Sequence, residues 1–194
     1  MKAFGADKLG MSDEEIADTV DKWRAASPHI TALWKSLENS ATKCIRKGMS
    51  TISTVGHIRF DMEDGVMWMT LPSGRRIAYW GASYGENKWG NPSITYMGKD
   101  QATGKWTRLE TWGGKLTENL VQATARDCLK EAMLALRDEH FDIRAHVHDE
   151  VIISERIGGR SVEDVCRIMG ATPSWATGLP LRADGYETPY YKKD

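Results

Sequence analysis

The sequence predicts an α+β protein in which an antiparallel sheet packs against a long helix and follows a helical N-terminal region. Three patterns support this prediction. Apolar residues first recur at three- and four-residue intervals, then short strand-like segments alternate with turns, and a second helical pattern finally leads into two apolar strands. These patterns occupy residues 12–48, 50–112, and 117–154, respectively.

Two helices are expected in the N-terminal region, residues 1–49. The segment 12–15, Ser-Asp-Glu-Glu, has the composition of a capping box that starts the first helix. A second helix is expected to begin near Pro28 and to end at Gly48. The apolar period then changes, so we divide the chain into a helical region, 1–49, and a sheet-containing region, 50–194.

A longer helix is expected after the strands, with Thr117 as its cap and an end near His140. Gln122 and Arg126 are four residues apart and therefore share a face, with Asp127 beside them. This helix should bury one side and present a row of hydrogen-bonding groups on another. The expected buried positions are Leu120, Cys128, Leu129, Met133 and Leu136.

Composition places the chain among soluble globular proteins of the cytoplasm. Its 194 residues and hydrophobic fraction of 41% suffice for a substantial core. No apolar run approaches the ~20 residues needed to cross a bilayer, and the N-terminus lacks a secretory signal pattern. The net charge of −1 neither favours nor excludes nucleic acid as a partner.

Cysteine and tryptophan usage favours structural roles. Cys44, Cys128 and Cys166 are odd in number, widely spaced, and lie in segments with helical patterns. We therefore expect buried free thiols rather than a disulfide framework or a zinc site. Most of the eight tryptophans lie on apolar faces or in strands, so we expect them in the core.

Polar residues interrupt the last pair of apolar strands, which we expect to form a hairpin. His148, Asp149 and Glu150 would lie at or beside its turn, and residues 151–153, Val-Ile-Ile, have the composition of a strand buried on both faces. Two adjacent carboxylates on such a scaffold commonly hold a divalent cation. The alternative is an exposed acidic turn. For His146 we expect a capped or core histidine.

Two blocks resemble the C-terminal part of family A DNA polymerases, the DNA polymerase I-like group, and in particular its bacteriophage branch. Residues 113–127, GGKLTENLVQATARD, resemble the long palm helix of this family, and residues 146–151, HVHDEV, resemble its second catalytic carboxylate motif. Their order and separation agree with the family. Further agreement comes from residues 71–76, from residues 2–5 leading into 23–28, and from the lysine-rich terminus.

The resemblance spans nearly the whole chain and implies its domain identities. Residues 1–49 would be the helical remnant of the fingers, and residues 50–194 the part of the palm that carries the catalytic hairpin. In this family the first metal-binding aspartate and the fingers helix that binds the triphosphate precede the point where this chain starts. The resemblance therefore implies a C-terminal portion that needs an N-terminal polymerase fragment for activity.

The resemblance also implies roles for the hairpin residues. Asp149 would be the second catalytic, metal-binding aspartate, and Glu150 an accessory carboxylate that acts through water. The complete enzyme would hold two Mg²⁺ ions and act on primer-template DNA and dNTP substrates. His148 would contact the primer near its terminus.

On the long helix, the resemblance implies that Gln122, with Arg126 on the same face, reaches minor-groove acceptors that every correct base pair presents. Asn119 and Lys115 are each one place away from the family's asparagine and arginine positions. A helix turns ~100° per residue, so the DNA-binding role carries over to these two less directly. Among other residues, Arg75 and Arg76 would either contact phosphate or be solvated.

Two other functions remain open from the sequence. The chain could be a catalytically inactive polymerase remnant that binds DNA or associates with itself. It could also be an unrelated hydrolase that binds a metal through His146, His148 and Asp149. The isolated chain is expected to self-associate, because a palm sheet without its remaining strand has an unpaired edge.

Overall fold

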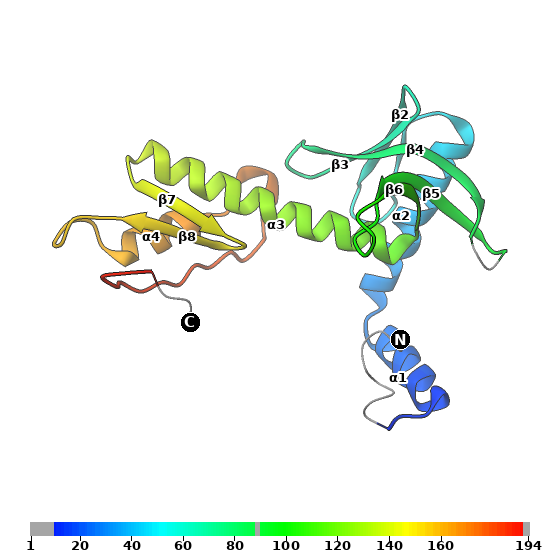
Figure 1. The fold of residues 1–194 in the computed structure, drawn as a ribbon, viewed down its shortest axis with the longest axis horizontal. Helices are drawn as coiled ribbons and strands as arrows, with labels where there is room; N and C mark the ends of the chain where they lie inside the picture. Colours follow the sequence, from blue (N-terminus) through cyan, green and yellow to red (C-terminus); the bar gives the residue numbers. More distant parts are fainter. Residues whose placement is uncertain (1–9, 88–89, 192–194) are drawn as a thin grey trace. The chain divides into compact units, whose positions relative to one another are not determined.

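The computed structural model describes residues 10–87 and 90–191, and it confirms the α+β class (Figure 1). Residues 2–5 and the lysines at 192–193, which contribute to the family resemblance, lie outside the described residues. The described chain forms two compact units. One contains the residues up to Thr70 together with Arg76–Glu118, and the other contains Leu71–Arg75 together with the residues from Asn119 onward.

The first unit begins with two helices, α1 (Asp13–Ala26) and α2 (Pro28–Lys47), both as predicted. The Ser12 hydroxyl accepts a hydrogen bond from the Glu15 amide, and the Glu15 carboxylate accepts one from the Ser12 amide, which completes the capping box. Helix α2 ends at Gly48, whose φ of 61° allows its amide to donate to the Cys44 carbonyl.

A six-stranded antiparallel sheet completes this unit, with its strands paired in chain order. The Asp64-Gly65 turn between β2 and β3 has positive φ at both residues, as a two-residue hairpin turn requires. Helix α2 packs against the first four strands, and Leu37, Phe60 and Met67 are fully buried there. The strands are β1 (Thr51–Ile52), β2 (Arg59–Glu63), β3 (Val66–Thr70), β4 (Arg76–Glu86), β5 (Pro92–Lys99) and β6 (Trp106–Thr111).

The second unit contains most of the long helix α3 (Gly113–Asp138), a separate two-stranded sheet and a short helix. The sheet is a hairpin of β7 (Asp142–Val147) and β8 (Glu150–Ser154). Helix α4 (Val162–Met169) follows, and the mostly extended tail contains one 3₁₀ turn, Ser174–Ala176. None of the helices in the described ranges is both long and apolar enough to cross a membrane.

Helix α3 begins four residues earlier than predicted. Thr117 is not its cap, because the Thr117 hydroxyl donates to the Gly113 carbonyl from inside the helix, at 2.9 Å. The Gly113 amide instead donates to the Glu38 carboxylate on α2, at 3.1 Å. A side chain distant in sequence therefore satisfies the start of the helix, and no local cap is needed.

Two expectations about burial were wrong, and the expectation of buried thiols holds for Cys44 but not for Cys128 and Cys166, which are half-buried. Residues 151–153 of β8 are half-buried, because their strand belongs to a two-stranded sheet rather than to a sheet covered on both faces. No tryptophan in the described part of the chain is fully buried; the Trp34 ring instead contacts those of Trp23 and Trp112, both with centroids 5.7 Å apart. All three cysteines are free thiols, and Cys44 is buried.

Candidate functional site

The turn of the β7–β8 hairpin positions the candidate catalytic residues. Val147 and Glu150 are cross-strand partners, so His148 and Asp149 form a two-residue loop and Glu150 begins β8. His148 has a φ of 53°, a left-handed conformation that is uncommon for residues other than glycine. His148, Asp149 and Glu150 are all exposed, and neither carboxylate forms an ion pair with another described residue.

The turn therefore presents two adjacent carboxylates at the end of a hydrogen-bonded hairpin. Rigid attachment matters, because a metal ion requires its ligands at fixed distances. Backbone strain of the kind seen at His148 persists only where surrounding structure imposes it, and such residues cluster at functional sites.

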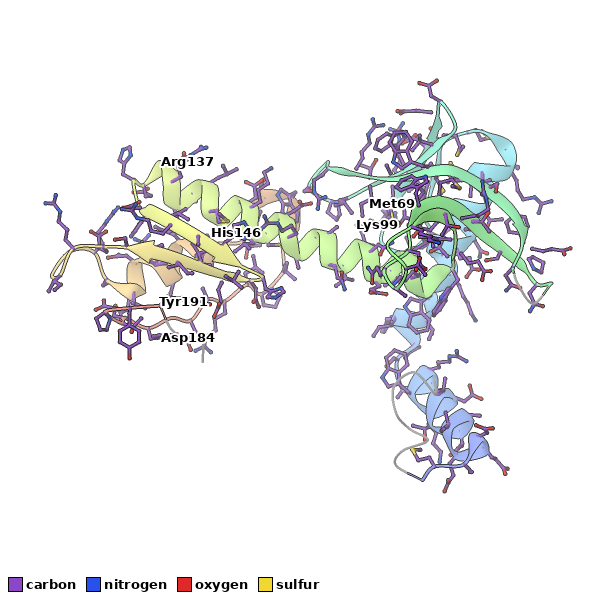
Figure 2. All side chains as sticks on the ribbon, in the orientation of Figure 1. Met69, Lys99, Arg137, His146, Asp184 and Tyr191 are labelled. Atoms are coloured by element: carbon purple, nitrogen blue, oxygen red, sulfur yellow. The ribbon has the colours of Figure 1, made fainter. Side chains whose placement is uncertain are left out.

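Helix α3 contributes the other candidate residues of the second unit. Gln122 and Arg126 are exposed, whereas Asn119 is half-buried. The Arg126 guanidinium lies 3.5 Å from Nε2 of His146. His146 is on strand β7 of the hairpin (Figure 2). His146 is exposed, so it is not the core histidine that was one of the two expectations, and its ring meets the Arg126 side chain of α3.

Lys115 belongs to the first turns of α3, in the first unit. Its ammonium group forms an ion pair of 2.9 Å with Glu118, three residues further along the helix. Both side chains are almost half exposed, so the attraction is weakened by solvent.

Asp127 on α3 forms hydrogen bonds with the turn between β3 and β4, a contact that we did not predict from the sequence. Asp127 is 3% exposed, and its carboxylate accepts hydrogen bonds from the Ser73 hydroxyl at 2.5 Å and from Nε of Arg75 at 2.6 Å. The Arg75 guanidinium also donates to the Ala123 carbonyl, at 2.9 Å. The Arg75 guanidinium is thus held by two acceptors on α3, although 43% of its side chain remains exposed.

A pattern in the sequence would have located this contact. Leu116, Leu120, Ala123 and Asp127 follow each other at intervals of four, three and four, so Asp127 occupies an apolar position of the helical stripe. A charged residue at such a position needs a buried partner. The neighbouring Arg76 differs, because it pairs with Glu63 at 2.8 Å and lies over the Trp68 ring within the first unit.

The chemistry of the donor set fits magnesium. Mg²⁺ prefers oxygen ligands and is commonly bound by one or two carboxylates together with substrate phosphates and water. Asp149 and Glu150 supply two such carboxylates. The described ranges contain no group of three or more histidine, cysteine, aspartate or glutamate side chains able to hold a metal ion, so a complete site requires ligands beyond them.

Comparison with known proteins indicates the class to which the hairpin and helix correspond. The chain is 40% identical over 192 residues to the DNA polymerase of Bacillus phage SP02. This similarity covers 98% of the chain, which spans 29% of the length of that polymerase. No protein-family model and no solved structure matches the chain.

Proposed function

We propose that this chain is the palm and distal-fingers portion of a template-directed DNA polymerase of family A, the DNA polymerase I-like group. The observation that carries the proposal is its identity of 40% with a phage DNA polymerase over nearly its whole length. In this assignment residues 1–49 are the fingers remnant and residues 50–194 are the part of the palm with the catalytic hairpin. The chain would act in DNA replication in the cytoplasm of the bacterial host.

Asp149 is the proposed catalytic metal ligand. Its exposed position in a two-residue hairpin turn leaves the carboxylate oxygens accessible to a cation. Mg²⁺ in such enzymes activates the primer 3′-hydroxyl and offsets the charge of the triphosphate during nucleotidyl transfer. Glu150, which follows directly at the start of β8, acts as an accessory carboxylate through water.

Minor-groove contacts to the primer-template are assigned to the neighbouring donors. His148 lies next to Asp149 in the turn, so a primer terminus at the metal ligand would also be within its reach. Gln122 and Arg126 share an exposed side of α3, and the contact of Arg126 with His146 links that side to the hairpin. All base pairs offer acceptors at equivalent minor-groove positions, so these donors test pair geometry and do not read sequence. Asn119 and Lys115 are secondary DNA contacts.

Activity is proposed to require a second polymerase portion. The described residues provide two carboxylates at the hairpin and no third metal-binding group beside them. The first catalytic aspartate and the residues that bind the dNTP triphosphate would come from an N-terminal polymerase fragment.

A reconstitution assay tests this proposal. The chain is mixed with the part of the phage SP02 polymerase that does not align with it, together with primer-template DNA, dNTPs and Mg²⁺. We expect primer extension, its loss in Asp149→Asn, and its retention in Asp142→Asn, which neutralises an exposed carboxylate at the other end of the same hairpin. Extension that survives Asp149→Asn would rule out the assigned role of Asp149.

A different negative result would favour the alternative function. If a correctly folded mixture binds primer-template DNA but never extends it, the chain would be an inactive polymerase remnant that serves as a DNA-binding or self-associating module.

A further inference from the structure

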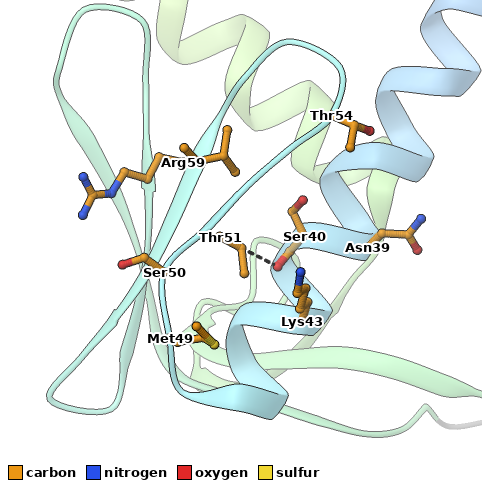
Figure 3. A pocket seen from close by; sticks show the side chains of 9 residues that line it. Asn39, Ser40, Lys43, Met49, Ser50, Thr51, Thr54 and Arg59 are labelled. Atoms are coloured by element: carbon orange, nitrogen blue, oxygen red, sulfur yellow. Dashed lines mark hydrogen bonds between the residues drawn. The ribbon is translucent and has the colours of Figure 1, made fainter.

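A hollow of about 710 Å³ lies in the first unit, between α2 and the segment that carries β1 and the start of β2 (Figure 3). Lys43 projects into it from α2, and hydroxyl groups line its wall. One of them, the Thr51 hydroxyl, is fixed by donating to the Ser40 carbonyl at 2.8 Å. A second hollow of about 400 Å³ adjoins it along α2, and Lys43 lines both.

The lining of the two hollows is basic. Lys43, Arg46 and Lys47 come from the last two turns of α2, and Arg59 comes from β2. Among the residues that the structure describes, no aspartate or glutamate lines either hollow. Within the described ranges, the three α2 cations have no ion-pair partner. In a chain whose net charge is −1, these residues form a local positively charged surface, to which anions are attracted.

Arg59 is positioned for an external ligand by a buried carboxylate. Its Nε donates to both oxygens of Asp61 at 2.9 Å, and the Ser50 hydroxyl donates to the same carboxylate at 2.5 Å. Asp61 is only 6% exposed, whereas more than half of the Arg59 side chain is exposed. Since Asp61 engages Nε alone, the two terminal amino groups of Arg59 can donate to another anion.

Apolar and aromatic groups accompany these cations. Met49 and Ile52 line the larger hollow, and both are more than half exposed. The Arg46 guanidinium lies over the exposed ring of Tyr84, 5.5 Å from its centroid. A duplex presents phosphates to such a surface and keeps its bases stacked. A single strand presents phosphates and base faces together.

We propose that this basic hollow binds the backbone of single-stranded DNA. Lys43, Lys47 and Arg59 neutralise its phosphates, while Met49, Ile52 and Tyr84 receive unstacked bases. The choice of DNA among polyanions rests on the proposed polymerase function. None of the residues of this surface belongs to the Asp149 hairpin, since they come from α2, β1, β2 and β4, with Met49 between α2 and β1.

The test measures binding of the full chain to a short labelled single strand by fluorescence anisotropy, with the matching duplex as competitor. The double variant Lys43→Gln/Lys47→Gln removes two phosphate contacts. Each contact contributes about 0.7 to the slope of log affinity against log salt, so the variant should bind about 25-fold more weakly at 0.1 M salt and its slope should fall by about 1.4. Circular dichroism would verify that the variant is folded.

The matched control is Lys99→Gln/Lys105→Gln, which removes the same charge at the β5–β6 end of the sheet. It should bind the strand like the unchanged chain. Equal weakening by both double variants, no weakening by either, or tighter binding of the duplex would overturn the proposal. Asp149→Asn should bind the strand normally. Failure of the unchanged chain to support primer extension in the reconstituted mixture, with its strand binding intact, would count against the polymerase assignment and leave the hollow as a binding site.

Discussion

Arg75 and Asp127 form an ion pair with 2.6 Å between Nε and Oδ1, although they are 52 residues apart in sequence. Asp127 is buried in this pair and Arg75 is partly exposed. The pair holds the 71–75 turn against the helix that carries Gln122 and Arg126, so it fixes the surroundings of the proposed DNA-binding face. The Ser73 hydroxyl gives the carboxylate a second donor from the same turn.

Replacing Arg75 should therefore destabilise the second unit. Arg75→Ala leaves a buried carboxylate with the Ser73 hydroxyl as its remaining donor in the described part of the chain, and such a loss costs about 3 kcal/mol. Arg76→Ala, which removes an exposed ion pair and a ring contact, should cost about 1 kcal/mol. Chemical denaturation combined with amide exchange of α3 measures both. Similar losses in the two variants would contradict the structural role of Asp127.

Because the backbone of His148 is left-handed, replacing this residue should affect the stability of the chain and the rate of primer extension differently. His148→Gly should leave the chain as stable or up to about 1 kcal/mol more stable, because glycine adopts positive φ without a steric penalty. His148→Ala should be less stable than the glycine variant. In the reconstituted polymerase both should slow primer extension, since both lose the imidazole. Thermal unfolding and extension rates measure the two effects, and a glycine variant less stable than the alanine variant would refute the strain argument.

The start of α3 tolerates no side chain at its first residue. A Cβ on Gly113 would lie 2.2 Å from the Trp34 carbonyl oxygen, which is backbone of α2, so Gly113→Ala should cost about 1–3 kcal/mol. A Cβ on Gly114 would meet the Trp112 ring, a half-exposed side chain that can move. Gly114→Ala should accordingly change stability by less than about 1 kcal/mol. Urea denaturation compares the two, and an equal loss at both positions would contradict this view of the α2–α3 contact.

The thiol of Cys44 should make the fold less stable in alkali. Burial, with a contribution from the nearby Asp61 carboxylate, raises the pKa of Cys44 from 9.0 to about 11. Between these values the unfolded chain has lost the proton and the folded chain retains it, so stability falls as pH rises. The full effect is about 3 kcal/mol.

Denaturation of the unchanged chain and of Cys44→Ala below pH 9 and near pH 11 isolates this effect. The alkaline loss should be smaller in the variant. The alkaline loss of stability that remains in the variant includes a contribution from Tyr96, because burial raises the pKa of Tyr96 as well. An identical pH dependence in both proteins would exclude Cys44 as a source. Cys44 should also react with thiol reagents only after unfolding.

Unpaired strand edges should make the isolated chain self-associate. In the described residues β7 and β8 pair only with each other, and β8 presents the half-buried sequence Val-Ile-Ile at one edge. Such an edge offers backbone donors and acceptors to a second copy. Light scattering should show a mass that rises with concentration, whereas a monomer over the whole range would contradict this expectation.

Local signals explain why much of the fold could be predicted. Ser12 with Glu15 and Ser161 with Asp164 form capping boxes, and Gly48 and Asp64-Gly65 have the backbone conformations that these residue types favour. Each depends on neighbours within a few residues. Sequence alone therefore determined the helices, the hairpins and the position of His148, Asp149 and Glu150 at a turn.

Contacts between distant segments determined the rest. Glu38 moves the start of α3 to Gly113, Arg75 accounts for the burial of Asp127, and Arg126 meets His146. The grouping of Lys43 and Arg59 around one hollow likewise depends on the packing of segments that are distant in sequence. The energies of these contacts depend on which distant segments fold side by side, and the local propensities of the residues do not determine that. The sequence was sufficient to identify the carboxylates of the turn, Asp149 and Glu150. Only the tertiary structure determined which side chains surround and support the candidate residues.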